Sequence, residues 1–192
     1  MWGATVLLLT GGLLTGCAGG GAGAGTSASP TAFSRTRPTC DLAPTALVNS
    51  VLGTKVGDPQ PDSQGSTVIC RYAPTATSNA VVIRIQTDMT SSTFRQARAV
   101  SDTAGLPTTD LPGFADVAYT SVLGTGTLAI NTVIALAGTI EIGVSSPASF
   151  EQEKALEAQI FAKFGIAVTG APTPSPSPST GPTATPSATV TP

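Results

Sequence analysis

Charged side chains are confined to one central stretch of this chain, and that stretch limits the size of the part that can fold. Of the 192 residues, every Lys, Arg, Asp and Glu except Arg35 lies within residues 37–168. Residues 17–36 are rich in Gly, Ala and Ser, and residues 169–192 contain 7 Pro and 11 Ser or Thr among 24 residues. Segments of this composition bury too little apolar surface to offset the entropy of ordering them. The sequence therefore predicts one folded domain between a flexible Gly/Ser linker and a disordered tail.

Composition excludes several classes of function. The formal net charge is −2, from 9 basic and 11 acidic side chains, whereas an electrostatic nucleic-acid binder needs a clustered basic excess, so we expect no nucleic-acid partner. The chain has no His, so the usual general base near neutral pH is missing, and 3 Cys without His do not make the common zinc sites. We accordingly predict no catalytic residues, no metal site and no cofactor.

The first residues resemble a bacterial lipoprotein signal. An apolar run over residues 6–14 is too short to cross a bilayer, which takes about 20 residues, and suits a secretory signal. It ends in Leu14-Thr15-Gly16-Cys17, similar to the lipobox pattern of an aliphatic residue, a small residue, Gly or Ala, and Cys. We predict that residues 1–16 are a signal peptide and that Cys17 is lipidated, which anchors the chain to the extracytoplasmic face of the cell membrane. Because no Lys or Arg precedes the run, an ordinary secretory signal with a chance Cys is the alternative.

Residue spacing within the domain predicts an α+β fold, an antiparallel β-sheet packed with an N-terminal, a middle and a C-terminal helix. Alternating apolar residues predict strands at Thr67–Tyr72, Asn79–Thr87, Asp116–Val122, Thr127–Ala137 and Thr139–Ser145. Helical spacing predicts helices at Pro44–Leu52, at Ser92–Asp102 and from Pro147 to Gly165. Gly53 suits a left-handed cap for the first helix, and Ser149 with Gln152 suits a capping box for the last.

The same spacing assigns side chains to faces. On the middle helix, Phe94, Ala97 and Val100 are expected to face the core, and Leu128 is expected to face inward from its strand. On the last helix the predicted apolar stripe consists of Leu156, Ile160, Phe161 and Phe164. Residues 121–140 contain no charge, which suggests a transmembrane helix, but their two-residue alternation and their glycines favour a buried hairpin.

Cys40 and Cys70 remain after Cys17 is lipidated, and two cysteines in a secreted chain usually pair. A disulfide closing a loop of this length should stabilise the fold by about 3–4 kcal/mol in the chain-entropy model. A reactive thiol or a redox pair is the alternative, although the spacing is unlike Cys-x-x-Cys.

Several short motifs, in this order, resemble the domain of unknown function 3558 family of actinobacterial lipoproteins. After the lipobox they are Cys40, Ala46-Leu47-Val48, Leu52-Gly53, Cys70-Arg71-Tyr72 and Pro112-Gly113-Phe114-Ala115-Asp116-Val117-Ala118-Tyr119. The chain departs from the family pattern at Tyr72, where Trp is frequent, and at Ala115, where Gly is frequent. The resemblance covers about Cys40 to Gly165 and implies a fold similar to the PsbP-like α/β/α sandwich, with no established activity and no catalytic residues.

Acidic residues offer little candidate chemistry. Glu153 and Glu157 are four residues apart and share one face of the last helix, which we expect to be a solvated surface away from the apolar stripe. Asp58 and Asp62 lie in a predicted loop and supply too few oxygens for calcium. Asp116 precedes a strand and is expected to hydrogen-bond its own turn.

The sequence thus predicts a lipid-anchored, non-enzymatic binding or accessory domain of the cell envelope, whose partner is an envelope protein or a small apolar ligand. A small basic patch of Arg84, Arg95 and Arg98 could dock an anionic head group or a partner, or only keep the surface soluble. Two other functions stay open: an envelope hydrolase using Ser and carboxylates, and a structural spacer whose tail engages the wall. A deep apolar pocket between the last helix and the sheet would indicate a carrier, and a filled core would indicate a docking module.

Overall fold

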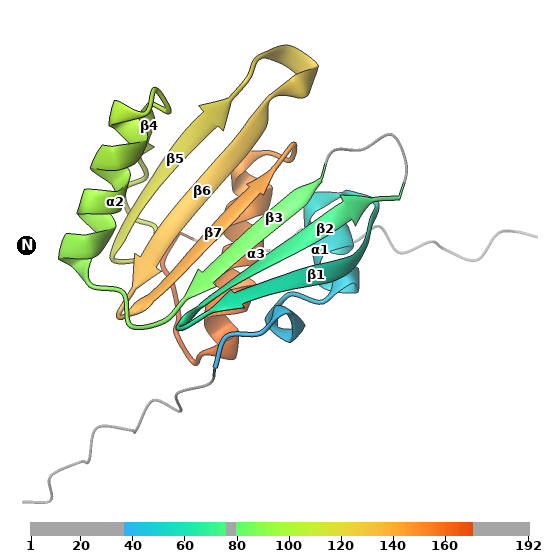
Figure 1. The fold of residues 1–192 in the computed structure, drawn as a ribbon, viewed down its shortest axis with the longest axis horizontal. Helices are drawn as coiled ribbons and strands as arrows, with labels where there is room; N and C mark the ends of the chain where they lie inside the picture. Colours follow the sequence, from blue (N-terminus) through green and yellow to red (C-terminus); the bar gives the residue numbers. More distant parts are fainter. Residues whose placement is uncertain (1–36, 76–79, 171–192) are drawn as a thin grey trace, which may run out of the picture. The chain divides into compact units, whose positions relative to one another are not determined.

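The computed structural model describes residues 37–75 and 80–170. Within them, seven strands form one sheet in the order β1-β2-β3-β7-β6-β5-β4, with every neighbouring pair antiparallel (Figure 1). The strands are β1 Val56–Gln64, β2 Thr67–Pro74, β3 Val81–Gln86, β4 Thr108–Asp110, β5 Val117–Leu123, β6 Ile130–Ala137 and β7 Ile140–Ser146. The α-helices of this part of the chain are α1 Thr45–Leu52, α2 Ser91–Thr103 and α3 Phe150–Lys163, with short 3₁₀ turns η1 Cys40–Leu42 and η2 Gly126–Leu128. The predicted α+β fold is confirmed.

Helices pack on both faces of the sheet. Helices α1 and α3 lie on one face of the sheet (Figure 1). They pack there on a core that includes inward side chains of β2, β3, β6 and β7. On the other face, Phe94 of α2 packs on Tyr119 of β5 with the ring centroids 5.4 Å apart. The alternating apolar residues of β2, β3 and β7 are buried except for Ile140, which is half-buried; the buried ones are Val68, Cys70, Tyr72, Val81, Ile83, Ile85, Ile142 and Val144. Burial of these apolar side chains is the main stabilising contribution to the fold.

The predicted helix ends are confirmed. Gly53 follows α1 with φ 65° and ψ 24°, a left-handed backbone that glycine adopts without steric cost. At the start of α3, the Ser149 side chain accepts a hydrogen bond from the backbone of Gln152, and the Gln152 side chain accepts one from the backbone of Ser149. These caps satisfy backbone groups that a helix end leaves unpaired.

Two strands lie where none was predicted. The segment around Asp58 and Asp62, expected to be a loop, is β1. It contains two prolines, which are disfavoured in strands, so its sequence did not indicate a strand. Because β1 is an edge strand that pairs along only one side, with β2, a residue without an N–H donor is tolerated there. The three-residue β4 is too short to show a detectable alternation.

Two side chains expected to face the core are exposed. Val100 is 64% exposed, because Phe94 is the buried residue through which α2 packs on the sheet. Leu128 is 75% exposed, because it belongs to η2 and β6 begins only at Ile130. The Leu128 prediction was wrong at an element boundary, where sequence patterns are least reliable, whereas Val100 lies inside α2 on a different face from Phe94.

Residues 121–140 form a hairpin and not a helix. Strands β5 and β6 pair from Val117 with Leu136 to Leu123 with Ile130, as the alternation predicted. In the described part of the chain, no helix is long and apolar enough to span a membrane.

Ala115 is a strained position, since it adopts a left-handed φ of 57°. A side chain in this conformation costs roughly 1–2 kcal/mol, partly offset on glycine substitution by the larger backbone entropy of the unfolded chain. We expect Ala115→Gly to raise the free energy of unfolding by about 0.5–1 kcal/mol, measured by urea titration. Ala104→Gly is the control, because Ala104 has φ −77° and the change should stabilise nothing. Equal responses of the two variants would contradict the strain at Ala115.

Candidate functional site

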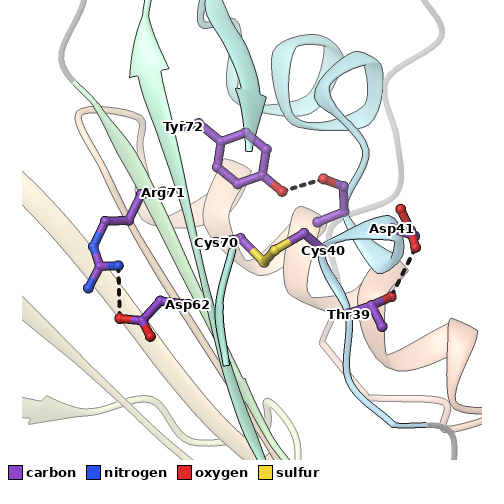
Figure 2. Close-up of a disulfide and its surroundings, with 8 residues drawn as sticks. Thr39, Cys40, Asp41, Asp62, Cys70, Arg71 and Tyr72 are labelled. Carbon is purple, nitrogen blue, oxygen red and sulfur yellow. Dashed lines mark hydrogen bonds and ion pairs between the residues drawn. A yellow bond between two sulfur atoms is a disulfide. The ribbon is translucent and has the colours of Figure 1, made fainter. Parts of the chain in front are cut away.

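The two cysteines of the domain are joined. Cys40 in η1 and Cys70 in β2 form a disulfide with an S–S distance of 2.05 Å and a Cα–Cα distance of 5.7 Å (Figure 2). Cys70 is fully buried and Cys40 is 7% exposed, so neither sulfur is presented to a substrate. The bridge holds the chain entering the domain against the sheet, which favours the structural interpretation over a redox pair. The predicted lipidation site, Cys17, lies outside the described residues.

A tyrosine beside the disulfide makes a second link between the same two segments. The hydroxyl of Tyr72, on β2, donates a hydrogen bond to the backbone carbonyl of Ala43, just after η1 (Figure 2). Tyr72 is fully buried, and burial raises the pKa of its phenol well above the usual value, so it stays a neutral donor. On the other side of β2, the exposed pair of Arg71 and Asp62 joins β2 to β1 at 3.2 Å.

Two glutamates of α3 are fully buried, which contradicts the predicted solvated face. Glu153 and Glu157 both have 0% exposure. Residues three and four apart lie on one face of a helix, so these two carboxyl groups share the face of Leu156 and Ile160. That face packs against β6 and β7, and the carboxyl groups are carried into the core with it.

The buried carboxyl groups have few partners. The hydroxyl of Ser146, at the end of β7, donates to Oε1 of Glu153 at 2.7 Å and accepts from the N–H of Ala148 at 3.1 Å. Oε2 of Glu153 and both carboxyl oxygens of Glu157 make no hydrogen bond, and neither side chain joins an ion pair within the described residues. Such groups are costly to ionise.

Burial therefore determines their protonation. It raises the pKa of Glu153 to about 8, against the smaller opposing effect of the Ser146 hydroxyl. Burial, and then the neighbouring Glu153 carboxyl, raise the pKa of Glu157 well above its ordinary value. Both side chains are thus held mainly as neutral carboxylic acids near pH 7.

A serine hydrogen-bonded to a buried acid is the arrangement that would favour a hydrolase, but here the pair is inaccessible to a substrate. Ser146, Glu153 and Glu157 all have 0% exposure, and the Ser146 hydroxyl is already bonded on both sides. A nucleophile must reach its substrate within hydrogen-bond distance. In this conformation, the cluster is part of the core.

The predicted basic patch is largely neutralised. Arg84 pairs with Glu141, which is only 1% exposed. Arg98 pairs with Asp110, donates to the hydroxyl of Thr108 at 2.7 Å and lies 5.3 Å from the ring centroid of Tyr119, a cation–π distance. These two arginines tie elements of the second sheet face together. Arg95 remains exposed on α2.

The other predicted acids also have structural contacts. Asp58 accepts a hydrogen bond from the hydroxyl of Thr45 at 3.0 Å. Asp116 accepts one from the N–H of Gly138 at 2.7 Å, so it fastens the β6–β7 turn and not its own turn as predicted. Across residues 37–75 and 80–170, no group of three or more His, Cys, Asp or Glu is placed to hold a metal ion.

The space between α3 and the sheet is filled by side chains with no exposure, including Leu156, Ile160 and Phe161. An apolar depression of about 400 Å³ lies elsewhere, on the surface of α2, lined by Gln96, Ala99, Val100, Thr103 and Ala104. In the described part of the chain, α3 therefore packs on β6 and β7 through a filled core. Comparisons of this chain with protein-family models, with curated proteins and with solved structures gave no match.

Proposed function

We propose that this protein is a lipid-anchored lipoprotein of the cell envelope whose domain is a non-enzymatic binding or accessory module. The observation that carries the proposal is Leu14-Thr15-Gly16-Cys17 at the end of a short apolar run. The Cys40–Cys70 disulfide supports it independently, because disulfides persist in oxidising compartments outside the cytosol.

Two features support a relationship to the domain of unknown function 3558 lipoproteins. The cysteines of the two separate motifs, at Cys40 and in Cys70-Arg71-Tyr72, are bonded to each other. Ala115, where that family often has glycine, adopts a backbone conformation that glycine favours. The helices on both faces of the sheet are also compatible with an α/β/α sandwich.

The anchor is tested with the full chain in a bacterial host that processes lipoproteins. We expect the wild-type protein to enter the detergent-rich phase of a Triton X-114 extract and to carry a mass increase from acyl chains on an N-terminal Cys17. Cys17→Ser should lose the acyl mass and leave that phase, because a protein without its chains has lost the buried hydrocarbon that holds it to the bilayer. Thr15→Ser keeps the small residue of the lipobox and should behave as wild type. An unmodified thiol at Cys17 in the membrane-extracted protein would overturn the proposal.

The Ser146–Glu153 hydrogen bond gives the hydrolase alternative its one specific support. That alternative predicts labelling of the folded protein by a fluorophosphonate probe, and loss of the label in Ser146→Ala. We expect no label on the folded wild-type protein, because Ser146 is fully buried.

A further inference from the structure

The β5–β6 hairpin ends in a tip that other strands do not flank. Strand β4 pairs with β5 no further than Ser121, and β7 pairs with β6 only from Asn131 onwards. Apart from the pairing of β5 with β6 itself, the segment between them, Val122–Ile130, thus has no neighbouring strand within the described residues. Figure 1 shows this turn extending beyond the ends of β7 and β3. We call this segment the hairpin tip.

The hairpin tip is apolar and without charge. Val122 is 43% exposed, Leu123 60% and Leu128 75%, and these are three of the five large apolar side chains exposed in the described part of the chain. No residue from Val117 to Ile140, a run of 24, carries a charge. Gathered apolar side chains on a projecting turn mark an interaction surface.

We propose that the hairpin tip enters the interfacial region of a lipid bilayer. Its side chains suit lipid better than a specific protein partner: it offers aliphatic groups and threonines, with no charged, amide or aromatic side chain to define a complementary protein surface. Interfacial segments bury their apolar side chains about 5–10 Å into the headgroup and acyl boundary, where water and headgroups still satisfy the backbone.

This inference rests on the proposed anchor, since an acylated Cys17 would hold the tip beside a bilayer and raise its effective concentration there. Arg37 lies 20 positions after Cys17, and a chain of that length reaches at most about 70 Å. In Figure 1 the β5–β6 turn lies at one end of the sheet, and the first described residues, in blue, lie towards the other. The eight residues of β6 span about 26 Å, so the tether can extend well beyond the length of the sheet along its strands, which allows the tip to contact the same membrane.

The test places a tryptophan at the tip of the full, acylated chain in phosphatidylcholine vesicles. Leu128→Trp replaces an exposed side chain, and the one Trp of the sequence, Trp2, lies in the segment that processing would remove. We expect a blue-shifted emission and about two-fold quenching by brominated lipid, as for side chains at the interfacial depth. Because the tip has no charge, the quenching should be the same with anionic lipid and at high salt. Thr139→Trp, at the exposed turn that follows the other end of β6, should remain unquenched.

Vesicle flotation separates the two proposals. If the acylated protein floats with the vesicles, and only the tryptophan at position 128 is quenched, the anchor proposal and the tip proposal are both supported. Flotation with equal, weak quenching at positions 128 and 139 overturns insertion of the tip and leaves the anchor intact. A protein that does not float contradicts the anchor and, with it, the tip proposal. A blue shift that grows with protein concentration in the absence of vesicles would overturn the lipid proposal in favour of contact with a second copy. Unchanged thermal unfolding of both variants shows that the fold is retained.

Discussion

The free energy of unfolding is expected to fall as the pH rises from about 5 to 9, through the effect of two buried glutamates. Glu153 and Glu157 have no exposure and are not part of any ion pair within the described residues. Glu153 accepts a hydrogen bond from the Ser146 hydroxyl, and for both groups burial outweighs the smaller opposing effects of nearby polar groups. The core therefore favours the protonated form of both groups.

The sign of this change in the free energy of unfolding follows from proton linkage. A carboxyl group whose pKa is higher in the folded protein holds more protons when folded, so its contribution to stability is complete below the unfolded pKa and is lost as the pH rises. For Glu153 this window runs from the ordinary value of 4.5 to about 8. One group with this shift accounts for a loss on the order of 4–5 kcal/mol above pH 8, and Glu157 shifts in the same direction.

A substitution separates the effect of this buried pair from the titration of groups elsewhere in the protein. Glu157→Met keeps a long unbranched side chain and removes the ionisable group, so it should be more stable than wild type at pH 8 by about 1–4 kcal/mol, with the difference shrinking towards pH 5. Glu151→Gln is the control on the same helix, because Glu151 is 67% exposed and its loss should change stability by less than about 0.5 kcal/mol. Urea titrations at several pH values measure both. A constant difference between Glu157→Met and wild type across this range would show that the carboxyl does not titrate on unfolding.

The buried glutamates also show where sequence reasoning was misled. The spacing of residues 153, 156, 157, 160, 161 and 164 is a continuous apolar-face pattern in which two members are Glu. Our prediction placed these two on a solvated face away from the apolar stripe, although their spacing puts them on the stripe itself; Glu is almost never fully buried without a partner. Spacing was the better guide here, because a helix that packs through one face carries every residue of that face inward.

Alternation predicted β2, β3 and β7 well, because these central strands have one face that must be buried. It missed β1, an edge strand rich in proline and polar residues, and it extended the β6 strand into the exposed tip at Leu128. At a sheet edge or a projecting turn, no neighbouring layer selects for apolar residues at every second position, so apolar alternation does not show where such a strand begins or ends. The cysteine pair was predictable from the number of cysteines and from the predicted signal peptide, whereas the buried Ser146–Glu153 contact depends on how α3 packs on β7.

Removing the disulfide is expected to lower the free energy of unfolding by about 3–4 kcal/mol. The bridge joins residues 30 apart, and the unfolded chain without it gains the entropy of an open loop of that size. Cys40→Ala combined with Cys70→Ala should therefore lower the thermal midpoint by about 10–15 °C for a domain of this length. Reduction of the wild-type protein should lower the midpoint by a similar amount, since both treatments release the same constraint.

Tyr72→Phe provides the control for this prediction. It removes the hydrogen bond to Ala43, which joins the same two segments, but leaves the disulfide and the apolar ring in place. Its expected cost is about 1–3 kcal/mol, the penalty for a buried acceptor left without its donor, and it should be seen in both the oxidised and the reduced protein. If the segment before α1 were held mainly by this hydrogen bond, the alanine pair would cost less than Tyr72→Phe. A thermal midpoint that the alanine pair leaves unchanged would mean that burial of the segment, and not the covalent link, fixes Cys40 against the sheet.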